Sequence, residues 1–361
     1  VSTLTASAQS VVPKWINNVK LSGFGIVQYT YNGQENNESN SFNLRLARLA
    51  LDGRAFDDWY WKAQIQFNGN TSTLGSSPKL VDLFIEWQKY DFLRVKAGQF
   101  KNPFTYENPM HPIDQGFMSY SQVISKFAGF SDRAGAHSSN GRDIGVQLQG
   151  DFLKNASGRN LIHYQVGVFN GQGINVKDVD QQKNIIGGAW VMPVEGMRLG
   201  AFGWIGSYAR KGTSASEGIT NTTLRRLQQR RYAFSAEYKV DDWTFRSEYV
   251  HSTGYAFAKA MVNTNDASAK DITLSSNGDK SQGVYALVIA PIIKKKCHAK
   301  ARYDMYQPSK GAEKQRTQYE IGLDYYFNKN ICLTGEYAYI HDRALADPNY
   351  SMIDVELSYR F

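Results

Sequence analysis

Apolar and polar residues alternate along much of this chain, most clearly at its C-terminal end. From Ile353 to Phe361, every second side chain is apolar, and the positions between them carry Asp, Glu, Ser and Arg. Because successive side chains of a β-strand point to opposite faces, this pattern predicts a strand with one apolar and one polar face. The strand 316–327 shows the same alternation, with Ile321 and Leu323 opposite Glu320 and Asp324.

Sixteen segments are predicted as strands on this basis, although 184–193 has no clear phase and 41–56 changes phase between Arg45 and Arg48, as a β-bulge would. The predicted strands are 18–32, 41–56, 59–69, 80–89, 92–101, 142–150, 161–170, 184–193, 197–207, 229–240, 243–251, 282–291, 296–307, 316–327, 330–341 and 351–361.

Short and long connections alternate between these strands. The short ones have two to four residues, with a longer exception at 151–160, and the long ones include 102–141, 171–183, 208–228 and 252–281. Bacterial outer-membrane barrels have short periplasmic turns and longer outer loops. The alternation therefore predicts such a barrel, with both termini in the periplasm, an N-terminal segment at 1–17 and the barrel itself at 18–361.

Composition agrees with a transmembrane barrel. The 361 residues are only 42% hydrophobic but 13% aromatic, and no run reaches the roughly 18 apolar residues that a membrane helix needs. The last strand resembles the closing strand of Gram-negative outer-membrane barrels, and its terminal Phe361 is similar to the residue that acts there as an assembly signal.

Cys297 and Cys332 are predicted to be unpaired. Ala6-Ser7-Ala8 has the small residues of a signal-peptide cleavage site.

The connection 102–141 is the longest, with 40 residues, and it is rich in apolar side chains such as Phe104, Phe117 and Phe127. A structureless loop of this length in a compact domain needs a reason. We expect it to fold into the lumen, where it narrows the barrel, and the alternative is an outer loop that packs on its neighbours. The whole chain has 41 Lys and Arg against 33 Asp and Glu, a formal charge of +8, but this loop is close to neutral.

Four motifs resemble the phosphate-selective porin O and P family. They begin at Phe42 (FNLRLARL, followed by Asp52-Gly53 and by WYWK at 59–62), Gly98 (GQFKNPF), Arg142 (RDIGVQLQG) and Val166 (VGVFNG). The resemblance implies a sixteen-stranded, homotrimeric anion channel of the outer membrane, with basic side chains on the barrel wall and constriction loop. One departure is Ser125-Lys126, where the family tends to have an arginine after an acidic residue.

The resemblance and the charge pattern together give the candidate residues for pore lining and anion contact. Arg45, Arg48, Lys62 and Lys101 match the family motifs, and the others are basic positions on the predicted polar faces or in the loop. The full set is Arg45, Arg48, Lys62, Arg94, Lys96, Lys101, Lys126 and Arg133. For any one of them, a structural ion pair in the wall is the alternative role.

Other constellations carry weaker signals. Loop 208–228 and the start of the next strand hold a basic group that includes Arg225 and Arg226, which is suited to lipopolysaccharide phosphates or to a solvated loop. Three oxygen-bearing residues near Asp178 have the chemistry of a calcium site but not EF-hand spacing, so a polar turn is the better interpretation. His298 and Asp304 share a face but lie about 20 Å apart along a strand at about 3.3 Å per residue.

The sequence contains no HExxH, GxSxG or Walker motif, so no enzymatic activity, cofactor or metal is predicted. We expect an outer-membrane porin for passive diffusion of small hydrophilic solutes, anionic or neutral, with a preference for anions or phosphate. The expected partners are outer-membrane lipid, lipopolysaccharide and copies of the chain itself, and no nucleic acid. The alternatives are a non-conducting barrel subunit of an outer-membrane assembly and, third, an outer-membrane hydrolase.

Overall fold

The computed structural model describes residues 15–68, 78–135, 139–258, 268–275 and 279–361. Within these residues, two short helices, η1 (Pro112–Asp114) and α2 (Gln122–Phe127), accompany seventeen strands. The strands are β1 (Ile16–Asn32), β2 (Ser39–Ala55), β3 (Trp59–Gln66), β4 (Lys79–Tyr90), β5 (Leu93–Lys101), β6 (Arg142–Lys154), β7 (Asn160–Phe169), β8 (Asn184–Val191), β9 (Met197–Ser214), β10 (Ile219–Val240), β11 (Trp243–Thr253), β12 (Ser268–Asp271), β13 (Lys280–Ile293), β14 (Cys297–Gln307), β15 (Arg316–Asn328), β16 (Ile331–Asp342) and β17 (Asn349–Arg360).

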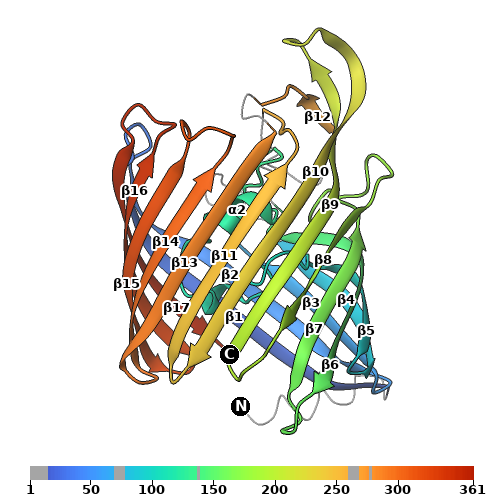
Figure 1. Ribbon diagram of the computed structural model, residues 1–361, viewed down its shortest axis with the longest axis vertical. Helices are drawn as coiled ribbons and strands as arrows, with labels where there is room; N and C mark the ends of the chain where they lie inside the picture. The colour runs from blue at the N-terminus through green and yellow to red at the C-terminus, as the bar shows by residue number, and fades with distance from the viewer. Residues whose placement is uncertain (1–14, 69–77, 136–138, 259–267, 276–278) are drawn as a thin grey trace.

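Sixteen of these strands form a closed antiparallel barrel, as predicted (Figure 1). Each pairs with its neighbours in sequence, β11 pairs with β13, and β1 closes the ring by pairing with both β2 and β17. The seventeenth, β12, lies in the connection after β11 and pairs in parallel with β9. Phe361 and Gly23 exchange two backbone hydrogen bonds of 3.0 and 3.1 Å, so the last residue takes part in barrel closure.

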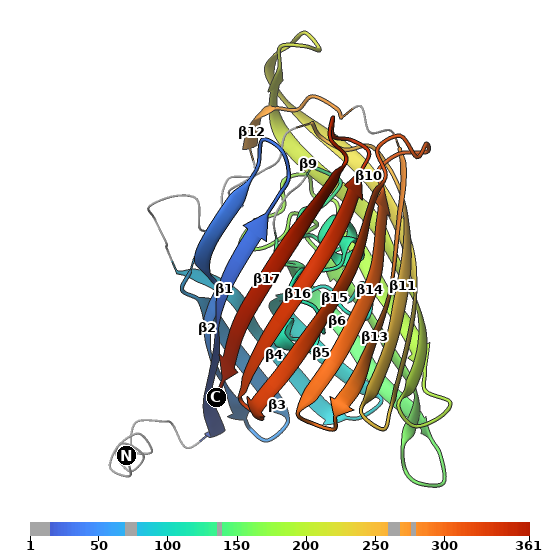
Figure 2. The same ribbon diagram turned by 90° about the vertical axis from the view of Figure 1, so that its left-hand side faces the viewer.

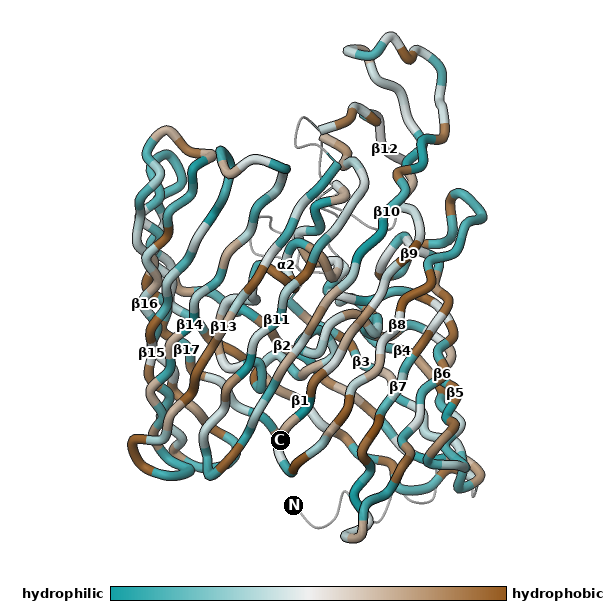
Figure 3. The backbone as a smooth tube through the Cα atoms, in the orientation of Figure 1, coloured by the Kyte–Doolittle hydropathy of each residue, from teal (hydrophilic) through white to brown (hydrophobic). Residues whose placement is uncertain are grey.

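The barrel wall is apolar outside and, except where it packs against apolar side chains of the lumen loop, polar inside. In β14, Arg302 and Asp304 face the lumen and are buried, whereas Tyr303 between them is exposed on the outer surface. In β17, Ile353, Val355, Leu357 and Tyr359 are likewise exposed, while Asp354 and Glu356 are buried. Figure 3 shows the resulting alternation of hydrophobic and hydrophilic positions along each strand. This inverted sidedness is what a lipid-facing barrel requires.

Local irregularities in the wall follow the sequence. The register of β1 against β2 shifts between Ile26 and Val27, which pair with Leu46 and Leu44, so Arg45 is the extra residue of a bulge. The predicted bulge in this strand is therefore confirmed. The prediction of a longer connection at 151–160 is wrong. β6 extends to Lys154 and β7 begins at Asn160, so only five residues lie between them.

The prediction of a loop at 208–228 is also wrong. β9 and β10 continue through it as a paired hairpin that projects beyond the rim of the barrel, and only residues 215–218 connect them (Figures 1 and 2). Beyond the bilayer both faces of a strand meet water, so the lipid-facing alternation that marks the other strands is lost there.

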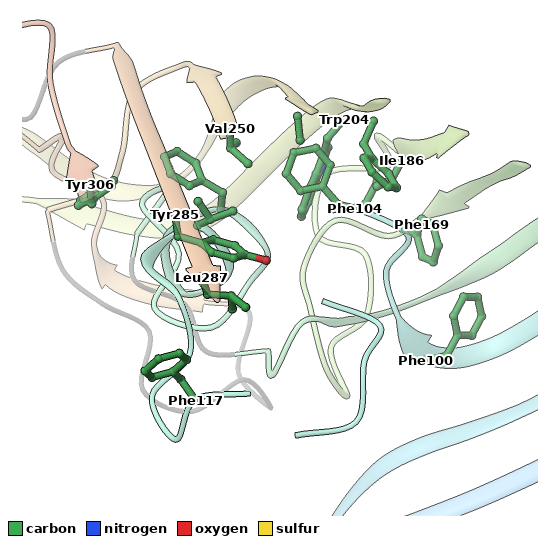
Figure 4. Packing of buried hydrophobic residues seen from close by; sticks show 14 residues of the cluster. Phe100, Phe104, Phe117, Phe169, Ile186, Trp204, Val250, Tyr285, Leu287 and Tyr306 are labelled. Atoms are coloured by element: carbon green, nitrogen blue, oxygen red, sulfur yellow. The ribbon is translucent and has the colours of Figure 1, made fainter. Parts of the chain in front are cut away.

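The connection 102–141 folds into the lumen, as predicted. Its helix α2 lies inside the barrel (Figure 1), and Phe104, Phe117 and Phe127 are almost completely buried. They belong to an apolar cluster with wall residues such as Trp204 and Tyr285 (Figure 4). The loop is therefore fixed to one side of the lumen by a hydrophobic core.

The cysteines and the N-terminal segment were also subjects of prediction. Cys297 and Cys332 are free thiols, as predicted. The Ala6-Ser7-Ala8 segment and most of the predicted N-terminal segment lie outside the described residues, and β1 begins at Ile16. Within the described part of the chain, no helix is long and apolar enough to cross a membrane.

Candidate functional site

Carboxylates of the wall hold the lumen loop by its backbone. Glu248 of β11 accepts hydrogen bonds from the backbone N–H groups of Tyr106 and Glu107, at 2.8 and 2.9 Å. Two further wall carboxylates act in the same way: Glu336 accepts from the N–H of Met118 at 3.0 Å, and Asp304 accepts from the N–H of Gln122 at 2.8 Å. Loop amides that water would otherwise solvate are thus satisfied by buried charge.

Cations of the same wall hold the loop carbonyls. Each donates to one backbone oxygen of the loop at 2.6–2.9 Å and also pairs with a wall or loop carboxylate. The four donor–acceptor pairs are Arg231 to Phe127, Arg246 to Gln115, Lys300 to Gly116 and Arg302 to Ser119. Their carboxylate partners are Asp132, Glu237, Glu336 with Asp324, and Glu320. The many charges on β10–β16 are therefore largely committed to loop docking.

The opposite side of the lumen has a different character. A cavity of about 230 Å³ lies between the loop segment Pro109–Pro112 and the wall formed by β1–β6. Five cationic side chains and one carboxylate, Asp82, line it. The cations are Arg48, Lys62, Lys96, Lys101 and Arg142. We call this cavity the basic passage.

Two of the five cations are neutralised locally. Arg142 forms a bidentate ion pair with Asp82, with N–O distances of 2.6 and 3.1 Å. Lys96 lies 3.7 Å from a carboxylate oxygen of Glu86.

The other three cations have no carboxylate within ion-pair distance among the described residues. Arg48 donates to the amide oxygen of Gln66 at 2.9 Å, Lys101 donates to the carbonyl of Met110 at 2.6 Å, and Lys62 lines the passage without a recorded hydrogen bond. The passage thus keeps an excess of positive charge.

A second, wider cavity of about 600 Å³ lies on the other side of the loop segment 110–118. Its lining has mixed charge: five Lys or Arg, four Asp or Glu, and two histidines. Arg45 belongs to this cavity and is paired with Glu356 at 2.8 Å. Unlike the basic passage, this cavity has nearly balanced charge.

The predicted pore residues are distributed unequally over these features. Arg48, Lys62, Lys96 and Lys101 line the basic passage, and Arg45 lines the wider cavity.

The other three predicted residues, Arg94, Lys126 and Arg133, are absent from the described lining of both cavities. Arg94 pairs with Asp151, Lys126 lies over the ring of Tyr306, and Arg133 donates to Gln229 and to the carbonyl of Gly254.

Arg142 was not among the predicted residues, although it stands in one of the quoted motifs. Lys101 and Arg142 flank the long loop and pair directly across β5 and β6. The two ends of a loop between antiparallel neighbours must meet, so the position of Arg142 opposite Lys101 was a usable signal.

The loop contributes a histidine to both cavities. His111 accepts a hydrogen bond at Nδ1 from the backbone N–H of Ile113, and its ring meets Phe24 edge-on at 4.4 Å between centroids. Burial, with the nearby cations Lys101 and Arg360, lowers the pKa of His111 to about 4. The side chain is therefore neutral at physiological pH and adds no charge to the passage.

Local contacts account for the other residue groups that the sequence singled out: the oxygen-bearing residues near Asp178, the basic group at Arg225 and Arg226, and the pair His298 and Asp304. Asp178 accepts hydrogen bonds from the backbone of Asp180 and Gln181, the geometry of a polar turn. Arg225 pairs with Glu217 and Arg226 with Asp180. His298 contacts Asp242 at 3.0 Å, whereas Asp304 binds the loop. No group of three or more metal-ligating side chains occurs within the described ranges.

Comparisons with known proteins agree with this architecture. No curated protein matches the chain. Among solved structures, an anion-selective porin from Comamonas acidovorans has 15% identity and a TM-score of 0.62, with 95% of this chain and 99% of that chain covered. The outer membrane channel DcaP of Acinetobacter baumannii has 12% identity and a TM-score of 0.61, with 95% and 97% covered. OmpT of Vibrio cholerae in its trimer form has 14% identity and a TM-score of 0.61, with 95% and 99% covered.

At these identities the solved structures establish the fold alone. The family description is independent of them and confirms the resemblance that the motifs predicted. Residues 22–180 match the family described as phosphate-selective porin O and P, and the barrel as a whole has the fold of outer-membrane porins.

Proposed function

We propose that this protein is an outer-membrane porin through which small hydrophilic solutes diffuse passively, with a preference for anions. The observation that carries the anion preference is the basic passage, with five cations and one carboxylate around about 230 Å³. The family match over residues 22–180 and the similarity to an anion-selective porin support the same function.

The physical reason is that a pore discriminates by charge where it is narrow. Low-dielectric walls focus the field of fixed charges into the lumen, and rings of basic side chains favour anions. Paired charges cancel at a distance of a few ångströms, so Arg48, Lys62 and Lys101 dominate the local field. Charges on distant loops are screened, since the Debye length is about 10 Å at 0.1 M salt.

The test is the reversal potential of single channels in a KCl gradient across planar bilayers. We expect the wild type to prefer chloride and the double variant Lys62→Gln, Lys101→Gln to shift the reversal potential towards potassium. The matched control neutralises Lys154 and Lys294, which are exposed and paired with Asp91 and Asp241 at the end with short turns. A wild type that prefers potassium rules out the anion preference and leaves a porin of other selectivity.

We also propose a homotrimer. The described strands β3, β5 and β8 have only eight or nine residues. At about 3.3 Å per residue and a tilt of about 45°, eight residues reach about 19 Å, less than the roughly 25 Å of the apolar band. A partner subunit against the side of the barrel formed by β3–β8, where these short strands alternate with longer ones, covers the mismatch. The trimer form of the OmpT structure is a precedent for the fold. Analytical ultracentrifugation in detergent tests the stoichiometry.

The remaining expectations belong to the same proposal. The end of the barrel with short turns also holds Phe361, which supports a periplasmic location for this end and for the N-terminal segment 1–17, with 18–361 as the barrel. The exposed cations Lys211 and Arg230 near the β9–β10 hairpin suit lipopolysaccharide phosphates at the outer rim. A non-conducting barrel subunit remains the second candidate, and silence in planar bilayers would favour it.

A further inference from the structure

The basic passage has an apolar component as well as a cationic one. Three phenylalanines of the wall, Phe24, Phe84 and Phe100, line it together with Pro109, Met110 and Pro112 of the loop. Phe84 is half-buried, and Phe24 and Phe100 have few exposed atoms. A solute in the passage therefore meets hydrocarbon as well as ammonium and guanidinium groups.

Rings and cations are interleaved at short range. The Nζ atom of Lys96 lies 5.0 Å from the ring centroid of Phe84 and 5.2 Å from that of Phe100. The two rings meet edge-on at 5.9 Å between centroids. On β2 and β1, the guanidinium of Arg48 lies 5.7 Å from the ring centroid of Phe24. One small molecule can thus contact a ring and a cation at once.

This combination suits some anions better than others. Inorganic anions such as phosphate keep a hydration shell that apolar side chains cannot replace, and removing a charge from water without compensating hydrogen bonds is costly. A carboxylate attached to an aromatic ring places its charge on the cations and its ring against the phenylalanines, where offset or edge-to-face contacts add about 0.5–1.5 kcal/mol. The passage is also below the roughly 300–1,000 Å³ of pockets for drug-sized ligands, which limits it to a single ring.

We propose that the basic passage is a binding site for small aromatic carboxylates of the size of benzoate, in preference to inorganic phosphate. This inference rests on the proposed porin function and specifies its solute class. The apolar side chains of the passage carry the preference among anions, whereas the cations carry the preference for anions over potassium.

The experiment measures block of the chloride current by benzoate, acetate and phosphate in planar bilayers containing the purified full-length protein. We expect benzoate to half-block at a concentration about tenfold below that of acetate, equivalent to about 1.4 kcal/mol, and further below that of phosphate. Equal half-blocking concentrations for benzoate and acetate overturn the inference while leaving the porin and its anion preference intact. A channel selective for potassium, in contrast, overturns the proposed function itself.

Variants separate the ring effect from the charge effect. Phe84→Gln keeps all five cations, and polar residues are already present at neighbouring lumen positions such as Gln64. We expect it to bring the benzoate and acetate values within about threefold of each other while the reversal potential in KCl keeps its sign. The control Tyr326→Gln removes a ring from the wider cavity instead. A tenfold preference that survives Phe84→Gln but is lost in Tyr326→Gln places the site elsewhere and refutes the assignment.

Discussion

Replacing Glu248 by Ala should loosen the lumen loop. The carboxylate of Glu248 is fully buried and accepts four hydrogen bonds, two from the loop backbone at Tyr106 and Glu107 and two from the hydroxyls of Ser235 and Tyr285. The alanine variant leaves both loop amides without an acceptor.

The magnitude follows from these contacts. A buried donor that loses its partner costs about 1–3 kcal/mol, so two amides cost about 2–6 kcal/mol of loop docking. Removing a buried carboxylate also relieves its desolvation, which places the net cost in the lower part of this range. Loop contacts at Glu336 and Asp304 remain in the variant. The expected outcome is therefore local release of the segment around Tyr106, not loss of the whole loop.

Two assays detect this release. Single-channel recordings should show a larger and noisier conductance, because the released segment leads directly into Pro109–Pro112 at the basic passage. Limited proteolysis should cut the loop of Glu248→Ala faster than that of the wild type. Glu248→Gln should be intermediate, since its amide oxygen can still accept while its NH₂ group faces donors.

The matched control is Asp151→Ala. Asp151 is a wall carboxylate that pairs with Arg94 and His163 and makes no recorded contact with the lumen loop among the described residues. It should leave conductance noise and proteolysis of the loop unchanged. A folded Glu248→Ala protein with wild-type conductance, noise and protease resistance would refute the view that wall charges hold the loop by its backbone.

Three further predictions follow from the loop and the barrel seam. Deleting 108–130 should raise single-channel conductance several-fold, and an unchanged conductance in a folded mutant contradicts a constriction role. Removing Phe361 deletes its hydrogen bonds with Gly23 and should reduce the amount of assembled protein in the outer membrane, measured by fractionation. His111 has a folded pKa of about 4, below its usual value, so the unfolded chain protonates first as pH falls. The free energy of unfolding should therefore decrease from about pH 6.5 to pH 4 and level off below, and His111→Gln should lack this part of the slope in urea titrations.

The barrel was largely predictable because lipid on one side and polar lumen on the other impose a period of two on every strand. The stretches Cys297–Asp304 of β14 and Ile353–Tyr359 of β17 satisfy this constraint. The prediction failed at the β9–β10 hairpin, which extends past the bilayer, where neither face is required to be apolar. Strand propensity alone is too weak to mark such a segment without the alternation.

The basic passage was only partly predictable. Lys62 and Lys101 were identified through their motifs, but their freedom from carboxylates depends on which partners the closed barrel brings across the lumen. The contact between Glu248 and Tyr106 joins residues 142 positions apart and depends on the path of the loop. No local pattern encodes such a contact, so the fate of each wall charge required the structure.

The two sides of the lumen explain why net charge is a poor guide to selectivity in this protein. The formal charge of +8 is a sum over the whole chain, and several wall carboxylates on β10–β16, such as Glu237, Glu320 and Glu336, are offset by neighbouring cations and bound to the loop. What remains near the loop segment Pro109–Pro112 is a small set of cations whose charge is not cancelled. Docking the loop against the mixed wall leaves the basic wall facing the passage. The anion preference and the stability of the constriction thus depend on largely separate sets of residues, although Lys101 belongs to both because it also holds the carbonyl of Met110. A variant such as Glu248→Ala should therefore alter conductance more than charge selectivity, and Lys62→Gln, which leaves that bond intact, should do the reverse.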